Sequence, residues 1–131
     1  MMRRLLRSDR GMGAVEFGFV APVICAFIVG VAQLGMLFFA NAGLQSAVAE
    51  GARLATIYPR PTNQQIIARI TDTRFGLDPA YITAPTVRDF QVNGRNYKEI
   101  SMSYQVPLDF IFFQTSPLTL VGNRRVYVHA S

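Results

Sequence analysis

The distribution of hydrophobic residues divides the chain into one long apolar stretch and a patterned remainder. Between Phe17 and Ala40 nearly every residue is apolar, and Gln33 is the one strongly polar side chain. Folded as a helix, this stretch would span about 36 Å, enough to cross a hydrocarbon core of about 30 Å with some tilt. The pattern therefore predicts a single transmembrane helix over about residues 17–40.

Apolar residues continue at helical spacing beyond this span. They are Leu44, Val48, Ala52 and Ala55, and they are followed by Pro59 and Pro61. Because proline interrupts a helix, we expect one long helix over residues 12–57.

A second, shorter helix is expected next. Thr62 and Gln65 have the spacing of a capping box, in which each side chain bonds the backbone N–H of the other residue. The apolar residues that follow are Ile66, Ile67, Ile70 and Phe75. Their spacing predicts an amphipathic helix that ends at Gly76.

The last part of the chain alternates apolar and polar residues, as strands do. Residues 86–92 and 97–106 flank Asn93-Gly94-Arg95-Asn96, a strong turn signal, and predict a hairpin. In its second strand Ile100, Met102, Tyr104 and Val106 occupy one face. Residues 124–131 predict a last strand, with positions 126, 128 and 130 on one face. We therefore expect a small α+β domain over residues 58–131, with a short helix and an antiparallel sheet.

Residues 108–113, LDFIFF, are unusually apolar for a connection between strands. They are either core packed against the long helix or a docking patch for another subunit. The core is the favoured interpretation, because a domain of about 75 residues needs its large apolar side chains inside.

Charge is concentrated at the N-terminus. The chain has a formal net charge of +5, and Arg3, Arg4, Arg7 and Arg10, against Asp9, supply +3 of it. Arginines before the span predict a cytoplasmic N-terminus and an exported C-terminal part. The remaining +2 is too small for a surface that tracks phosphates, so we expect no nucleic-acid partner.

Candidate chemistry is sparse. Cys25 is the one cysteine and His129 the one histidine, and neither stands at metal-ligand spacing from other ligands. The acids of the C-terminal part have no catalytic spacing; they are Asp72, Asp78, Asp89, Glu99 and Asp109. We therefore expect no catalytic residue, cofactor, metal or small-molecule substrate.

Two other N-terminal signals fit less well than a membrane anchor. A cleaved secretory signal peptide has an apolar core of only about 7–15 residues. A lipoprotein signal would place a small residue before its cysteine, whereas Ile24 precedes Cys25.

The segment between the arginines and the apolar stretch carries a family resemblance. Gly11 is followed five positions later by Glu16 and six positions later by Phe17. This arrangement resembles type IV prepilins, and the Glu-aromatic pair resembles their tight-adherence (Tad/Flp) branch. In that family prepilin peptidase cuts after the glycine, which implies removal of residues 1–11 and a new N-terminus at Met12, where the broader family often has Phe.

The continuation narrows the resemblance. Residues 41–53, NAGLQSAVAEGAR, resemble the segment after the membrane helix in TadE-like proteins, and Glu50 to Arg53 are its most specific part. The resemblance implies a structural minor pilin or pseudopilin of a Tad-type adhesive pilus, not an enzyme. It also implies residence in the bacterial inner membrane, with incorporation into an extracellular pilus as a further expectation. The implied partners are membrane lipid, prepilin peptidase, other Tad pilins and the pilus assembly machinery.

Within this interpretation Glu16 has an assembly role beside Phe17. The Glu16 carboxylate of one subunit would pair with the Met12 α-amine of a neighbour, which gives register more than net stability. The alternative is a carboxylate solvated at the level of the lipid headgroups. Glu50 and Arg53 are either a helix–domain contact or an ordinary exposed ion pair.

Two rival functions remain. The first is an unprocessed single-pass scaffold or sensor that uses the helix as a permanent anchor. The second is a small membrane-tethered hydrolase, which has only the exported domain in its favour.

Overall fold

The computed structural model describes residues 9–110, 113–114 and 116–128. The helices are α1 (Asp9–Ala55) and α2 (Asn63–Thr73), with a 3-10 turn, η1 (Pro79–Tyr81). The strands are β1 (Ile82–Val92), β2 (Arg95–Val106), β3 (Asp109–Phe110), β4 (Phe113–Gln114) and β5 (Leu118–Val128). A long N-terminal helix followed by a short helix and an antiparallel sheet confirms the expected α+β class.

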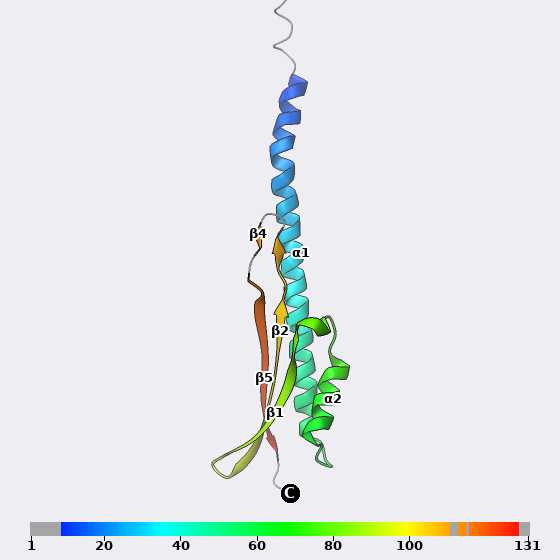
Figure 1. Cartoon of the computed structure of the whole chain (residues 1–131), viewed down its shortest axis with the longest axis vertical. Coiled ribbons are helices and arrows are strands. Elements are labelled where there is room, and N and C mark those ends of the chain that lie inside the picture. Colours follow the sequence, from blue (N-terminus) through cyan, green and yellow to red (C-terminus); the bar gives the residue numbers. More distant parts are fainter. Residues whose placement is uncertain (1–8, 111–112, 115, 129–131) are drawn as a thin grey trace, which may run out of the picture.

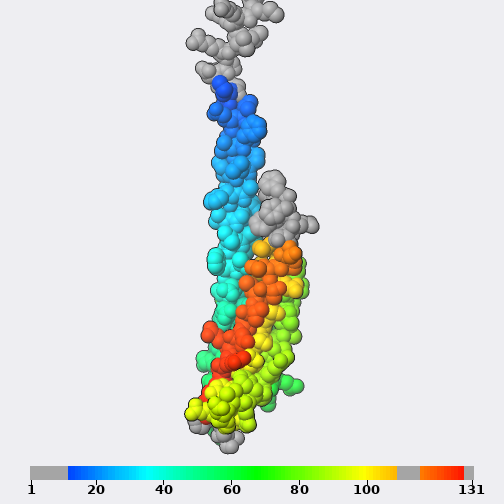
Figure 2. All heavy atoms as spheres, turned by 90° about the vertical axis from the view of Figure 1, so that its left-hand side faces the viewer, coloured from blue at the N-terminus to red at the C-terminus, as the bar shows by residue number. Residues whose placement is uncertain are grey.

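Helix α1 is the axis of the molecule, and its two halves have different surroundings. The half nearer the C-terminus lies against α2 and the sheet, whereas the N-terminal half extends beyond them (Figure 1). The space-filling view shows β5 against the lower part of α1 and the upper part standing clear (Figure 2).

The main sheet has the strand order β1-β2-β5, with both pairs antiparallel. Asn93 and Gly94 connect β1 to β2, with φ of 52° and 73°. Positive φ at both central residues is what a tight two-residue hairpin requires, and it explains the Asn-Gly pair. The predicted hairpin is therefore confirmed, although its turn is two residues long and both strands are longer than expected.

The core lies between α1, α2 and one face of the sheet. Strand β2 contributes Ile100, Met102, Tyr104 and Val106, all buried, as its alternation predicts. Helix α1 contributes Ala40, Leu44, Ala47, Val48, Ala52 and Ala55, and α2 contributes Ile66 and Ile70. Thr62 and Gln65 form the expected capping box at the start of α2.

Close packing explains two glycines of α1. A Cβ at Gly43 would collide with the backbone carbonyl of Phe75, and one at Gly51 would come within 2.5 Å of the Ile70 side chain. Glycine at these positions therefore lets α2 and the chain after it approach the long helix closely.

Both helices end earlier than the sequence predicts. Helix α1 ends at Ala55 instead of residue 57, and α2 ends at Thr73 instead of Gly76. Arg74 is already extended, and Phe75 packs its ring on Phe39 of α1, 5.6 Å between centroids, instead of continuing the helix.

Strand β5 begins at Leu118, six residues before the predicted start. It pairs with β2 from Val106↔Leu118 to Asn96↔Val128, so its length is set by its neighbour. A glycine such as Gly122 often marks a turn, but here it lies within the strand. The side chains of Val48 and Leu44 of α1 occupy the space beside it. Residues 129–131, part of the predicted strand, lie outside the described residues.

Candidate functional site

The N-terminal half of α1 presents an apolar surface that no described part of the chain covers. Its exposed large apolar side chains are Met12, Val15, Phe17, Phe19, Val20, Val23, Ile24, Phe27, Ile28, Val31, Leu34 and Met36. Apolar surface of this extent is unfavourable in water. This helix is long and apolar enough to cross a membrane, which indicates membrane anchoring.

The residues predicted for processing and assembly lie at the start of this surface. Gly11 lies inside α1, and Met12, Glu16 and Phe17 are exposed on it. Because Met12 and Glu16 are four residues apart in a helix, they lie on the same side, one turn apart. Within the described residues this group meets no other helix or strand.

Glu50 joins the two helices. Its Oε1 atom lies 2.7 Å from Arg53 Nη2 and 2.8 Å from Arg69 Nη2 of α2, and Arg53 Nε donates to Oε2 at 2.9 Å. Hydrogen bonds first from Arg53 and then from Arg69 lower the pKa of Glu50 from 4.5 to about 2. Glu50 therefore contacts the domain through Arg69, whereas Arg53 bonds it from within α1.

Sequence analysis did not identify Arg69, because the contact depends on how α2 lies on α1. Both arginine side chains are about half exposed or more, so solvent screens the attraction. The group orients α2 more than it stabilises the fold.

A second polar group, formed by Lys98, Asp89 and Asn63, connects α2 to the sheet. The sequence analysis did not identify it. Lys98, 5% exposed, donates to Asp89 Oδ1 at 2.6 Å and to Asn63 Oδ1 at 2.5 Å. Lys98 first and Asn63 second lower the pKa of Asp89. The alternation of β2 places Lys98 on the same face as the buried Ile100 and Met102, which indicates a buried lysine that needs a polar partner. Asp89 lies directly opposite Lys98 across the hairpin.

The sheet face opposite α1 carries a row of rings. Phe90 stacks on Tyr97, and Tyr97 meets Tyr127 edge to face, at centroid distances of 5.6 and 5.7 Å. In the next row Arg125 Nε donates to Glu99 Oε1 at 3.0 Å and, with Asn123, lowers the pKa of Glu99. These cross-strand contacts fix the register of the sheet.

The described residues provide no candidate metal centre. Across residues 9–110, 113–114 and 116–128, no group of three or more His, Cys, Asp or Glu side chains could hold a metal ion. The polar groups described above are paired within the domain and orient its elements.

A comparison with protein families also singles out the long helix α1. The model of the TadE-like protein family matches residues 11–53, which is α1 from Gly11 to Arg53. The match covers the N-terminal hydrophobic helix and not the α+β domain that follows it. The N-terminal region of the chain is therefore similar to the TadE-like family, which confirms the resemblance drawn from Gly11, Glu16 and residues 41–53. Searches of curated proteins and of solved structures found no match.

Proposed function

We propose that this chain is a minor pilin or pseudopilin of a Tad-type adhesive pilus, trimmed by prepilin peptidase after Gly11. It acts in assembly or priming of the pilus and has a structural role, without catalytic chemistry of its own. The observation that carries the proposal is the uncovered apolar half of α1, which begins at the expected processing site and falls within the TadE-like match.

Membrane lipid is the first partner of this surface. The arginines before it keep the N-terminus in the cytoplasm, and the α+β domain is exported across the inner membrane. Other Tad pilins, brought together by the assembly machinery, are the second partners. Gly13, Gly18 and Gly35 have open space where a side chain would stand, so helices of neighbouring subunits can approach α1 closely there.

Glu16 sets the register of this assembly. Cleavage after Gly11 leaves an α-amine on Met12, one turn from Glu16 on the same side of α1. In a bundle of such helices the Glu16 carboxylate of one subunit pairs with the amine of the next. Removing one member of a buried pair costs about 3–5 kcal/mol, enough to exclude a subunit from the complex.

The experiment expresses the full chain with its peptidase and partner pilins and measures the N-terminal mass in membranes and in sheared pili. We expect a mature chain that begins at Met12, and full-length chain when Gly11→Val obstructs the cut. Glu16→Ala should be inserted and cut normally, yet fail to co-purify with partner pilins, while Glu16→Gln, which keeps a hydrogen-bonding group, should be milder. A reporter active only after export, fused at the C-terminus, should be active.

An intact N-terminus in the wild-type chain would favour the rival function, an unprocessed membrane scaffold or sensor. Normal piliation by Glu16→Ala would instead remove Glu16 from the assembly mechanism while leaving the membrane anchor in place.

A further inference from the structure

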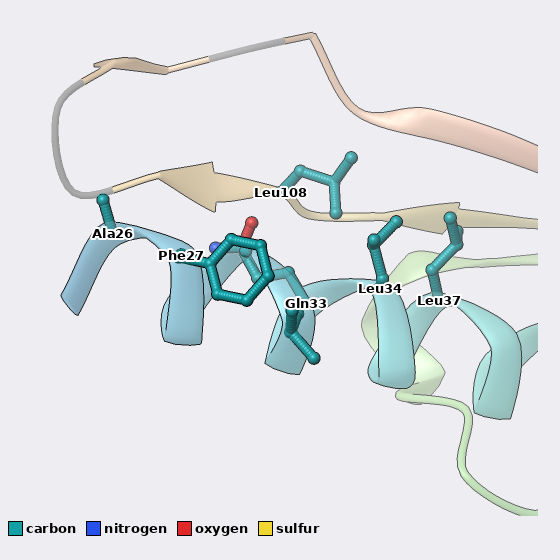
Figure 3. Close-up of a pocket in the computed structure, with 8 residues that line it drawn as sticks. Ala26, Phe27, Gln33, Leu34, Leu37 and Leu108 are labelled. Atoms are coloured by element: carbon teal, nitrogen blue, oxygen red, sulfur yellow. The ribbon is translucent and has the colours of Figure 1, made fainter. Parts of the chain in front are cut away.

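An apolar groove lies where the sheet domain first meets the uncovered half of α1. Helix α1 lines it with Ala26, Phe27, Val31, Leu34 and Leu37, and Leu108, between β2 and β3, lines it from the opposite side. Figure 3 shows Leu108 across from the helix, near Gln33 and Leu34. The short β3–β4 pair lies beside α1 on this side, beyond the ends of β2 and β5 (Figure 1).

The groove stands at the depth of the outer membrane boundary. At 1.5 Å per residue, Phe27 lies about 22 Å along α1 from Met12, and Leu34 about 33 Å. A hydrocarbon core of about 30 Å that starts at Met12 therefore ends between them. A core that starts at Phe17 ends near Leu37 and contains nearly the whole groove. Either placement puts Phe27 in hydrocarbon and Leu108 at membrane depth.

The groove also has the polarity of a lipid-facing surface. Phe27 is 71% exposed and Leu34 is 54% exposed, whereas the polar Gln33 between them is only 8% exposed. The polar side chain is thus covered by the protein and the apolar ones are open. Water would be a poor occupant of this surface, because apolar area left in water costs free energy.

We propose that the outer leaflet fills this groove, with a lipid acyl chain along α1 from Phe27 to Leu37 and Leu108 inserted at the interface. The inference rests on the proposed membrane anchor and adds a second membrane contact made by the sheet domain. A flexible acyl chain suits the site better than another helix, because helices pack at 8–10 Å between axes over several turns and the chain at Leu108 interrupts that path.

The chain contains no tryptophan, so single substitutions provide clean depth probes. Leu108→Trp and Pro107→Trp report on the proposed contact. Ile24→Trp, in the uncovered part of α1, reports on the anchor, and Tyr127→Trp, near the far end of β5, reports on the exposed domain. Each full-length variant is reconstituted in phosphatidylcholine vesicles whose acyl chains carry bromine near the headgroup or near the bilayer centre, and circular dichroism checks its folding.

We expect bromine near the headgroup to quench Leu108→Trp or Pro107→Trp by at least about twofold, and bromine at the centre to quench them less. Ile24→Trp should be quenched and Tyr127→Trp should not. If Ile24→Trp is quenched while both contact variants are not, the groove holds protein or water and the inference is wrong. If Ile24→Trp is not quenched either, the membrane anchor of the proposed function fails as well.

Discussion

The two halves of α1 belong to one continuous helix and are both rich in apolar and small residues, yet they meet different surroundings. Gly30 and Gly35 face open space, whereas a side chain at Gly43 or Gly51 would collide with the chain after α2 or with Ile70. The N-terminal half exposes its large side chains, and the C-terminal half buries Leu44 and its neighbours. Similar composition therefore forms an uncovered apolar surface in one half and an internal core in the other.

The polar residues of the two halves differ in the same way. Glu50 in the packed half finds its partners, Arg53 and Arg69, within the chain. Glu16 in the uncovered half lies at a distance from every other described element. A carboxylate with partners inside the chain orients the fold, whereas one that faces outward is available to a neighbouring subunit.

The sharpest test of this difference truncates one isoleucine of α2 that packs against the C-terminal half of α1 and one isoleucine of the N-terminal half itself. Ile70 is 0% exposed in the core between α1 and α2, and Ile28 is 59% exposed. Ile70→Ala should lower the free energy of unfolding of the sheet domain by about 2–5 kcal/mol, because it leaves a cavity. Ile28→Ala should leave it unchanged. Urea unfolding in detergent, followed by circular dichroism, measures both, and equal losses would mean that the two halves do not differ.

A smaller effect is expected from adding a methyl group to glycine. Gly43→Ala sets a Cβ against the backbone carbonyl of Phe75, which cannot rotate away, and overpacking of this kind costs about 1–3 kcal/mol. Gly35→Ala in the uncovered half meets open space and should be neutral or stabilise the helix by up to about 1 kcal/mol.

Gly51→Ala provides an internal check on this reasoning, because its obstacle is the Ile70 side chain. Its cost should be lower in the Ile70→Ala background than in the wild type, and unfolding of the double variant measures the difference. Additive losses would show that the close approach of α2 to α1 is not what excludes a side chain at position 51.

Local patterns predicted much of this fold because they report contacts within a single element. The capping box of Thr62 and Gln65 and the buried face of β2 are both read from neighbouring residues, and both are present. Asp89 and Lys98 are direct partners because the turn at 93–94 is two residues long, whereas the turn expected at 93–96 would set Asp89 opposite Ile100.

Contacts between distant elements were not predictable in the same way. The Glu50–Arg69 contact and the clash at Gly43 depend on how α2 and its following loop lie on α1, and no periodicity within either element encodes that placement. The start of β5 was missed for a related reason. Its length follows β2, and Gly122 is there for packing against α1 instead of for a turn.

The smallest expected effect concerns pH and the ion pairs of the packed half. The folded pKa of Glu50 is about 2 against 4.5 in the unfolded chain, so its contribution to stability is complete above pH 4.5 and is lost as pH falls toward 2. The wild type should therefore lose its stability advantage over Glu50→Gln across this range. Asp89 and Glu99, whose pKa values are also lowered, are present in both proteins, and their contributions cancel in the difference.

Arg69→Gln separates the contact between helices from the one within α1. It leaves the Arg53 hydrogen bonds, which are the larger cause of the lowered Glu50 pKa, so most of the pH-dependent difference should persist. Thermal unfolding of the three proteins from pH 6 to pH 2 measures the effect, which should be modest because the arginines are exposed. Parallel curves for the wild type and Glu50→Gln over the whole range would show that Glu50 is an ordinary solvated carboxylate and that its bonds to Arg53 and Arg69 do not stabilise the fold.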